Sequence, residues 1–104
     1  MNFDLAACRE TDPYTATTIK RLSDLLGYQV DVWDLFFPPP LDSNREEAVI
    51  FRQAAVAICR TCPLMFSCLE RAIELRDWDG IHGGKSRPEK LALAAARRRT
   101  RGAA

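Results

Sequence analysis

Apolar side chains recur at helical spacing soon after the chain begins. Asp12 is a suitable N-cap, because its carboxylate can accept hydrogen bonds from unpaired amides of a first turn, and Pro13 suits the first helical position. Gly27 is well placed to end the helix. The pattern therefore predicts a first helix from Pro13 to about Gly27, with an apolar stripe made of Ile19, Leu22, Leu25 and Leu26.

The following stretch, residues 28–41, is rich in aromatic residues and proline. Three consecutive prolines, Pro38 to Pro40, forbid an α-helix at that point and favour polyproline II. We expect the whole stretch to be extended or irregular. It is also conspicuously apolar, with Trp33, Leu35, Phe36 and Phe37.

A second helix is predicted in the middle of the chain. Ser43 followed by Glu46 fits a capping box, in which each residue satisfies a backbone amide of the other. The run that follows, up to Ile58, is rich in alanine and large apolar residues. It predicts a well-buried helix that ends at Cys59.

A third helix should begin within a turn of the second, because Pro63 suits a first helical position. Thr61 or Cys62 would be its cap. One face of this helix is apolar, made of Leu64, Cys68, Leu69, Ala72 and Ile73.

Residues 77–85 are typical of a turn, because glycines supply unusual backbone angles at three positions. Ser86 and Glu89 form a second capping box and predict a last helix, with Leu91, Ala94 and Ala95 facing inward. No segment alternates as a strand does. The sequence therefore predicts an all-α fold, a small bundle of about four short helices, with a body at residues 1–84 and a basic helix and tail at residues 85–104.

The net charge of +1 conceals an asymmetry between these two parts. From Lys85 onward there are seven basic residues and one acidic residue, whereas the preceding residues hold 8 basic and 13 acidic side chains. A basic tail suits phosphates and an acidic body suits a basic protein surface. The alternative for the tail is a solvated helix end, because cations also favour the negative end of the helix dipole.

No apolar run approaches the roughly 20 residues that span a bilayer, and the first ten residues have no basic segment typical of a secretion signal. We therefore expect a cytoplasmic protein. Structural disulfides are rare in that reducing compartment. The four cysteines consequently need a different role.

Three of the cysteines follow a C-x₂-C-x₅-C pattern, Cys59, Cys62 and Cys68, and Cys8 stands alone. The first two lie at the predicted junction of two helices, so their sulfurs can point to one centre, and Cys68 follows about a turn and a half later. Four thiolates suit a tetrahedral zinc ion or an iron–sulfur cluster. The spacing favours a cluster, because zinc sites usually have two paired knuckles.

The cysteines also admit roles without a cluster. One is a zinc-stapled DNA-binding module. A second is a disulfide reductase using the C-x₂-C motif, although the βαβ pattern of thioredoxin-like proteins is absent from the sequence. A catalytic cysteine would need a general base, and the only histidine is His82. We therefore expect the protein not to be an enzyme.

Four motifs occur in order along the chain: Asp34-Leu35-Phe36-Phe37-Pro38, then Ala57 to Pro63, then Cys68 to Ala72, then Gly80-Ile81-His82-Gly83-Gly84. Together with the isolated Cys8, they resemble the WhiB-like proteins of actinobacteria and their phages. The resemblance covers roughly residues 34–92. It implies a small all-α protein that holds a [4Fe–4S] cluster on Cys8, Cys59, Cys62 and Cys68.

The resemblance also implies a transcription regulator. Several members bind the C-terminal domain of the principal sigma factor of RNA polymerase, many respond to nitric oxide or oxygen, and a basic C-terminal segment contacts DNA. One chain supplies all four ligands, so a monomer suffices. The sigma-binding residues expected here are Phe36, Phe37, Pro38, Trp78, Gly80, Ile81, His82, Gly83 and Gly84. The DNA-binding residues expected are Lys85, Arg87, Lys90, Arg97, Arg98, Arg99 and Arg101.

The chain departs from the family pattern in two places. His82 occupies a position where a tryptophan is usual and where that tryptophan contacts sigma, and we expect Trp78 to supply a nearby aromatic ring. An apparent insertion, roughly Tyr14 to Trp33, separates Cys8 from the Phe-Phe-Pro motif. This insertion contains the first predicted helix. It is either an extra element that faces sigma or another partner, or a surface addition, and we favour the surface addition.

Overall fold

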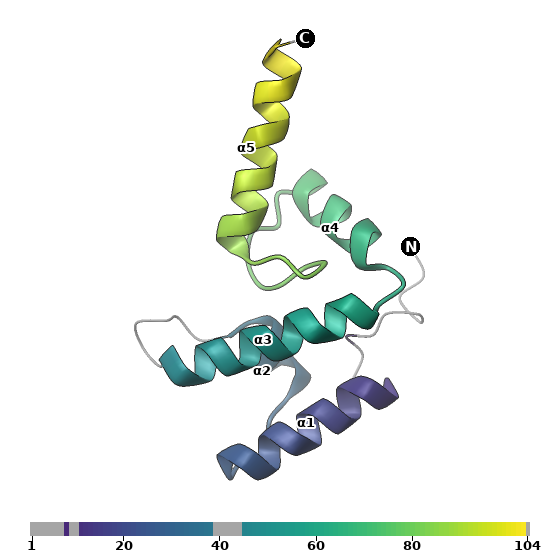
Figure 1. Ribbon diagram of the computed structural model, residues 1–104, viewed down its shortest axis with the longest axis vertical. Coiled ribbons are helices and arrows are strands. Elements are labelled where there is room, and N and C mark those ends of the chain that lie inside the picture. Colours follow the sequence, from purple (N-terminus) through teal and green to yellow (C-terminus); the bar gives the residue numbers. More distant parts are fainter. Residues whose placement is uncertain (1–7, 9–10, 39–44, 104) are drawn as a thin grey trace.

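The computed structural model describes residues 8, 11–38 and 45–103, which form five α-helices and one isolated β-bridge (Figure 1). The all-α prediction is confirmed. The helices are α1 (Pro13–Leu26), α2 (Val32–Phe36), α3 (Arg45–Thr61), α4 (Met65–Glu74) and α5 (Arg87–Ala103).

Helix α1 has the predicted ends. Asp12 Oδ2 accepts a hydrogen bond from the Thr15 amide at 3.1 Å, and Gly27 ends the helix in the left-handed conformation with φ 80°. The predicted apolar stripe is right for three of its members, which pack on the core, but wrong for Leu25, which is 71% exposed. The face of α1 that packs on the core is therefore made of Ile19, Leu22 and Leu26.

Helix α2 lies within the stretch expected to be extended, so that expectation is wrong for residues 32–36. A capping box starts the helix: Asp31 accepts from the Trp33 amide at 3.2 Å, and Asp34 accepts from the Asp31 amide at 2.9 Å. The prolines do not prevent this helix, because Pro38 lies after it, and Pro39 and Pro40 lie outside the described residues.

Helix α3 is the centre of the fold, because its buried residues form the core together with those of α2 and the turn after α4. The helix extends two residues beyond the predicted end at Cys59. Its predicted cap, Ser43, lies outside the described residues.

In Figure 1, α1 runs beside α3 and α2 lies against α3, while α4 and α5 lie on the other side of α3. The main core consists of Val30, Leu35, Phe36, Phe51, Ala55, Ile58, Cys59 and Ile81.

Helix α4 begins later than expected. Its N-cap is Leu64, with no side-chain cap, rather than Thr61 or Cys62.

No single helix in the described part of the chain is long and apolar enough to cross a membrane. Helices α3 and α4 taken together, which are bent by 115° relative to each other, meet that test on length and composition alone.

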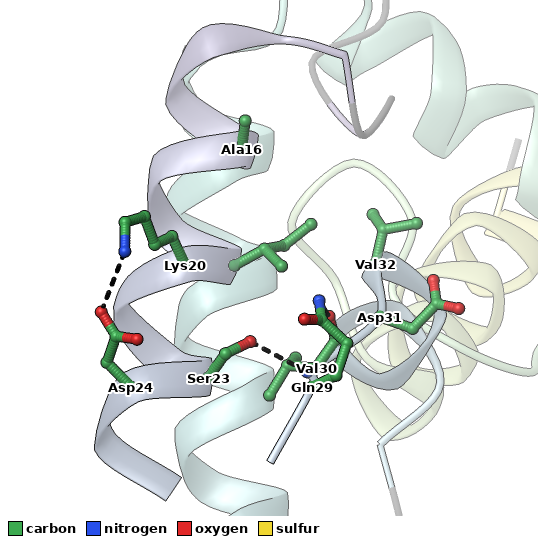
Figure 2. A pocket seen from close by; sticks show the side chains of 9 residues that line it. Ala16, Lys20, Ser23, Asp24, Gln29, Val30, Asp31 and Val32 are labelled. Carbon is green, nitrogen blue, oxygen red and sulfur yellow. Dashed lines mark hydrogen bonds and ion pairs between the residues drawn. The ribbon is translucent and has the colours of Figure 1, made fainter. Parts of the chain in front are cut away.

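A groove of about 510 Å³ separates α1 from the segment that leads into α2 (Figure 2). The Val30 amide donates to Ser23 Oγ at 2.9 Å across its end, and Lys20 pairs with Asp24 along its outer edge at 3.4 Å. The hydrogen bond between Val30 and Ser23 attaches α1 to the segment that leads into α2.

Candidate metal centre

All four cysteines line one cavity of about 200 Å³. Cys59 comes from the last turn of α3, Cys62 from the α3–α4 junction, Cys68 from α4, and Cys8 from the segment before α1. The other lining residues are mainly apolar: Phe36, Phe37, Leu64, Met65, Ile81, His82 and Gly83. The structure thus brings together the four residues that the sequence singles out as ligands.

The thiols in this cavity disfavour one another's ionised form. Burial raises the pKa of the Cys59 thiol to about 11, and the other three cysteines add to that rise. Burial also raises the pKa of Cys8, as do Cys62 and Cys68. The residue Cys8 is exposed as a whole, but its sulfur is partly shielded by its neighbours. A cationic ligand would favour the thiolate forms of Cys8, Cys59 and Cys68 against these effects.

The glycine turn aims backbone amides at two of the sulfurs. Hydrogen bonds from the Gly84 amide to Cys59 and from the Gly83 amide to Cys68 lower the pKa of each thiol, against the larger effect of burial. A third amide, that of Leu64, donates to Cys62 Sγ at 3.4 Å. Such amides stabilise negative charge on ligating sulfur, so the protein supplies a supporting shell for thiolates.

Gly83 cannot be replaced without displacing α4. Its φ of 56° suits glycine, and a Cβ atom there would lie 2.5 Å from the Met65 carbonyl oxygen and 2.6 Å from Leu69 Cβ. The turn therefore approaches the first turn of α4 more closely than any side chain allows. This close approach is what brings its amides to the cavity.

Lys90 holds the glycine turn from the inside. Its side chain is fully buried, and its ammonium donates to the carbonyl oxygens of Asp77, Asp79 and Gly80 at 2.9, 3.2 and 3.0 Å. The sequence pattern predicts that Lys90 contacts DNA and that Leu91 faces inward. Both predictions are wrong, because Lys90 takes the inward position and cannot reach a phosphate, while Leu91 is 39% exposed.

His82 also points into this network. Its Nδ1 lies 2.7 Å from the Lys90 nitrogen, so a neutral imidazole shares the three N–H groups of Lys90 with the three carbonyl oxygens, and its Nε2 lies 3.4 Å from Asp77 Oδ2. Burial, and then the charge of Lys90, lower the pKa of His82, while Asp77 opposes them. The imidazole is thus part of the turn's internal hydrogen bonding, half-buried beside the cysteine cavity.

The residues expected to bind sigma fall into four environments. Phe36, Ile81 and Gly83 are buried, so their part in any contact is indirect. Phe37 is exposed and stacks on Trp33 with ring centroids 4.1 Å apart. Trp78 does not lie with them: it lines a groove between α4 and α5. The remaining members are half-buried: Pro38, Gly80, His82 and Gly84.

Trp33 is a surface residue that the family motifs do not select, because it falls within the apparent insertion. It is 64% exposed, and with Phe37 and Pro38 it lines a groove of about 740 Å³ that also includes Gly80 and Arg87. A signal is nevertheless present in the sequence. Trp33 and Phe37 are four residues apart, the spacing at which two aromatic side chains meet on one face of a helix.

The remaining cations expected to contact DNA are surface residues. Lys85 pairs with Glu89 at 3.9 Å, and Arg87 pairs with Asp79 at 3.2 Å. Arg97 makes two bonds to the Glu70 carboxylate, of 3.0 and 2.6 Å, which join α5 to α4. The other three arginines are exposed on α5: Arg98, Arg99 and Arg101.

Comparison with known proteins gives a consistent result. Residues 3–93 match the family described as Transcription factor WhiB. The chain is 31% identical over 96 residues to "Transcriptional regulator WhiB1" of Bifidobacterium longum, covering 92% of this chain and 79% of that protein. It is 33% identical over 93 residues to "Redox- and pH-responsive transcriptional regulator WhiB3" of Mycobacterium tuberculosis, covering 75% of this chain and 89% of that protein. No solved structure gave a significant match.

Replacing Gly83 by alanine should cost roughly 3 kcal/mol of unfolding free energy, because a strained backbone is combined with a steric clash. Gly27→Ala is the matched control, since Gly27 also has a positive φ but has nothing within 4 Å of the added Cβ. That variant should lose only about 1 kcal/mol. Urea denaturation of both variants measures the difference, and equal losses would mean that the close approach to α4 is unimportant.

Replacing Lys90 by methionine should cost about 3 kcal/mol, because three buried carbonyl oxygens lose their donor. Lys20→Met is the control: it removes a cation paired at 3.4 Å on the surface. Its effect should stay within about 0.5 kcal/mol. Thermal and urea denaturation provide the comparison. A Lys90 variant as stable as the control would contradict the role described for the buried ammonium.

Proposed function

The chain belongs to the WhiB family of transcription factors, and from that membership we propose that it is an iron–sulfur cluster-dependent transcription regulator. In this proposal it binds the C-terminal domain of the principal sigma factor and contacts DNA. The observation that carries the proposal is the cavity of about 200 Å³ lined by all four cysteines.

The donor set fits a cluster better than a single ion. Four thiols share one cavity, and the charges of the other three cysteines raise the pKa of Cys59. Yet in the described part of the chain no three cysteine, histidine or acidic side chains gather closely enough to hold one metal ion. A [4Fe–4S] cluster is larger than one ion, so it suits thiolates that surround a cavity.

When bound, such a cluster supplies redox chemistry and a site that nitric oxide or oxygen can attack. The protein's own residues would control access to it. Phe36 and Ile81 are buried beside the cysteines and limit the entry of water. The Gly83 and Gly84 amides would stabilise thiolate charge. Cys8 would join the start of the chain to the site, so loss of the shared ligand would release that segment.

The proposed sigma-binding surface is the exposed pair Trp33 and Phe37 with the groove beside it. Two stacked aromatic rings of which one is 64% exposed are costly to leave in water, and such residues are typical anchors at interfaces. Phe37 also lines the cysteine cavity. A change at the cysteines would therefore act directly on this surface.

The proposed DNA-binding surface is formed by cations on and beside α5. Arg98, Arg99 and Arg101 would neutralise phosphates, together with Lys85, Arg87 and Arg97 once these exchange their present carboxylate partners. Such contacts give salt-dependent affinity with little base recognition.

Protein purified without air should contain about four iron and about four sulfide ions per chain, with a broad visible absorbance, and little zinc. Cys62→Ser should lose most of the iron. Ser67→Ala is the control, because it changes one side-chain atom on α4 next to Cys68 without removing a cysteine, and it should retain the iron. Elemental analysis measures both. One zinc per chain without sulfide would instead support a zinc-stapled DNA-binding module and remove the basis for gas sensing.

Trp33→Ala should weaken binding to a sigma C-terminal domain by at least about tenfold, because an exposed aromatic anchor is lost. Trp33 does not line the cysteine cavity, so the iron content should not change. Phe66→Ala is the control, since Phe66 is 75% exposed and lies outside that surface. Calorimetry with anaerobic protein measures both.

The same assay tests the response to gas. Nitric oxide that bleaches the visible absorbance should also weaken sigma binding of the unmodified protein. Unchanged binding after complete bleaching would contradict sensing, and equal losses in the Trp33 and Phe66 variants would contradict the assigned surface.

A further inference from the structure

A groove of about 470 Å³ lies between α4 and α5, and its charge is unusual for this chain. The α4 wall and the segment after it contribute Arg76 and Trp78, which lie outside the basic tail. The α5 wall contributes three arginines of the tail. The complete lining is Glu70, Ile73, Glu74, Arg76, Trp78, Ala94, Arg97, Arg98 and Arg101.

Cations exceed anions in this groove. Four guanidinium groups face two carboxylates, and one of these carboxylates, that of Glu70, is already engaged by Arg97 at 2.6 Å. Arg76, Arg98 and Arg101 are left with Glu74 as the only other acidic lining residue. The groove therefore attracts a polyanion, although the body of the chain is acidic.

The backbone at Arg76 carries a second, independent observation. Arg76 has φ 56°, and it is the only residue other than glycine with a positive φ in the described part of the chain. It lies just after α4, where glycine or asparagine usually occupies the left-handed position. An arginine there is conformationally costly, and an observed strain of this kind points to a role for the side chain.

Trp78 supplies the apolar surface of the groove. Its ring is half-buried and lines the groove together with Ile73 and Ala94. An aromatic ring among guanidinium groups is the combination used by surfaces that bind single-stranded nucleic acids, where bases stack on the ring and the cations meet phosphates. Against a duplex, whose bases are already stacked, such a ring has the sugars to pack on.

We propose that this groove binds the phosphate backbone of DNA, with Arg76 and Trp78 as contacts outside the basic tail. The inference rests on the DNA contact proposed above and extends it from one helix to both walls of a groove. Each strand of a DNA duplex carries about one charge per 3.4 Å of the helix axis, so successive phosphates of one backbone can meet guanidinium groups from both walls. Arg97 is paired with Glu70 and would contact a phosphate only by exchanging that partner.

Arg76→Gln tests the groove with a mixed-sequence duplex of about 20 base pairs and full-length protein purified without air. Fluorescence anisotropy between about 50 and 200 mM salt should show several-fold weaker binding and a log–log salt slope shallower by about 0.9, the loss of one phosphate contact. Arg71→Gln is the control, because it removes the same charge from an exposed position on α4 that does not line the groove.

A third variant, the double replacement Arg98→Gln and Arg101→Gln, separates this inference from the function it rests on. If the double variant loses affinity while Arg76→Gln behaves like Arg71→Gln, the tail contacts DNA and the groove proposal is wrong. If the unmodified protein does not bind the duplex at low salt, both proposals fail. Binding of a polyglutamate peptide in place of the duplex, lost in Arg76→Gln, would show that the groove serves an acidic protein and would overturn the assignment to DNA.

Arg76→Gly distinguishes a binding role from a structural one. Glycine adopts a positive φ freely, so this variant should unfold at a higher temperature than the unmodified protein while binding DNA more weakly. Arg76→Lys should retain most of the affinity. A glycine variant that binds DNA as well as the unmodified protein would refute the proposal whatever its stability.

Discussion

The arrangement of this protein depends on the buried ammonium of Lys90. From α5 it reaches three carbonyl oxygens of the turn after α4 and the ring of His82. The same turn is tied to the end of α2, because the Ile81 amide donates to the Phe36 carbonyl oxygen at 2.8 Å. Because burying an unpaired charge is costly, the turn and α5 hold one geometry relative to each other. That geometry places two glycine amides against cysteine sulfurs.

This network gives the cysteine cavity two neighbours with different chemistry. On one side is the exposed aromatic pair of Trp33 and Phe37, and Phe37 forms part of the cavity wall. The second neighbour is α5, which is held through Lys90 and carries the arginines of the tail; its Arg87 lines one groove together with Trp33 and Phe37. A small domain thereby brings an apolar surface suited to a protein and a basic surface suited to phosphate within reach of one centre. Both surfaces depend on the glycine turn.

Much of the fold and of the site could be predicted from local signals. Caps and breakers act within a few residues, so Asp12 and Gly27 correctly mark α1, and the C-x₂-C spacing correctly indicates the joint between α3 and α4. The burial of Lys90 could not be predicted, because its hydrogen-bond acceptors are backbone carbonyl oxygens, and their orientation is set only when the turn has folded. Helix α2 is not predicted when the three prolines are taken to exclude a helix from the whole stretch, although they lie after α2 in the sequence. The position of Trp78 could not be predicted either. Trp78 is close to the glycine turn in sequence, but this does not determine on which side of the turn its side chain lies.

The position of Cys8 has a thermodynamic consequence. If Cys8 and Cys59 share a ligand, they close a ring of about 50 residues that contains α1, α2 and most of α3. Closing a loop of that length removes chain entropy from the unfolded state equivalent to about 4 kcal/mol, as a disulfide of the same span would. Losing the ligand would return this freedom to the chain. Because that freedom belongs to the unfolded state, the consequence would be a lower free energy of unfolding for the whole fold, including the segments that carry Trp33 and Phe37.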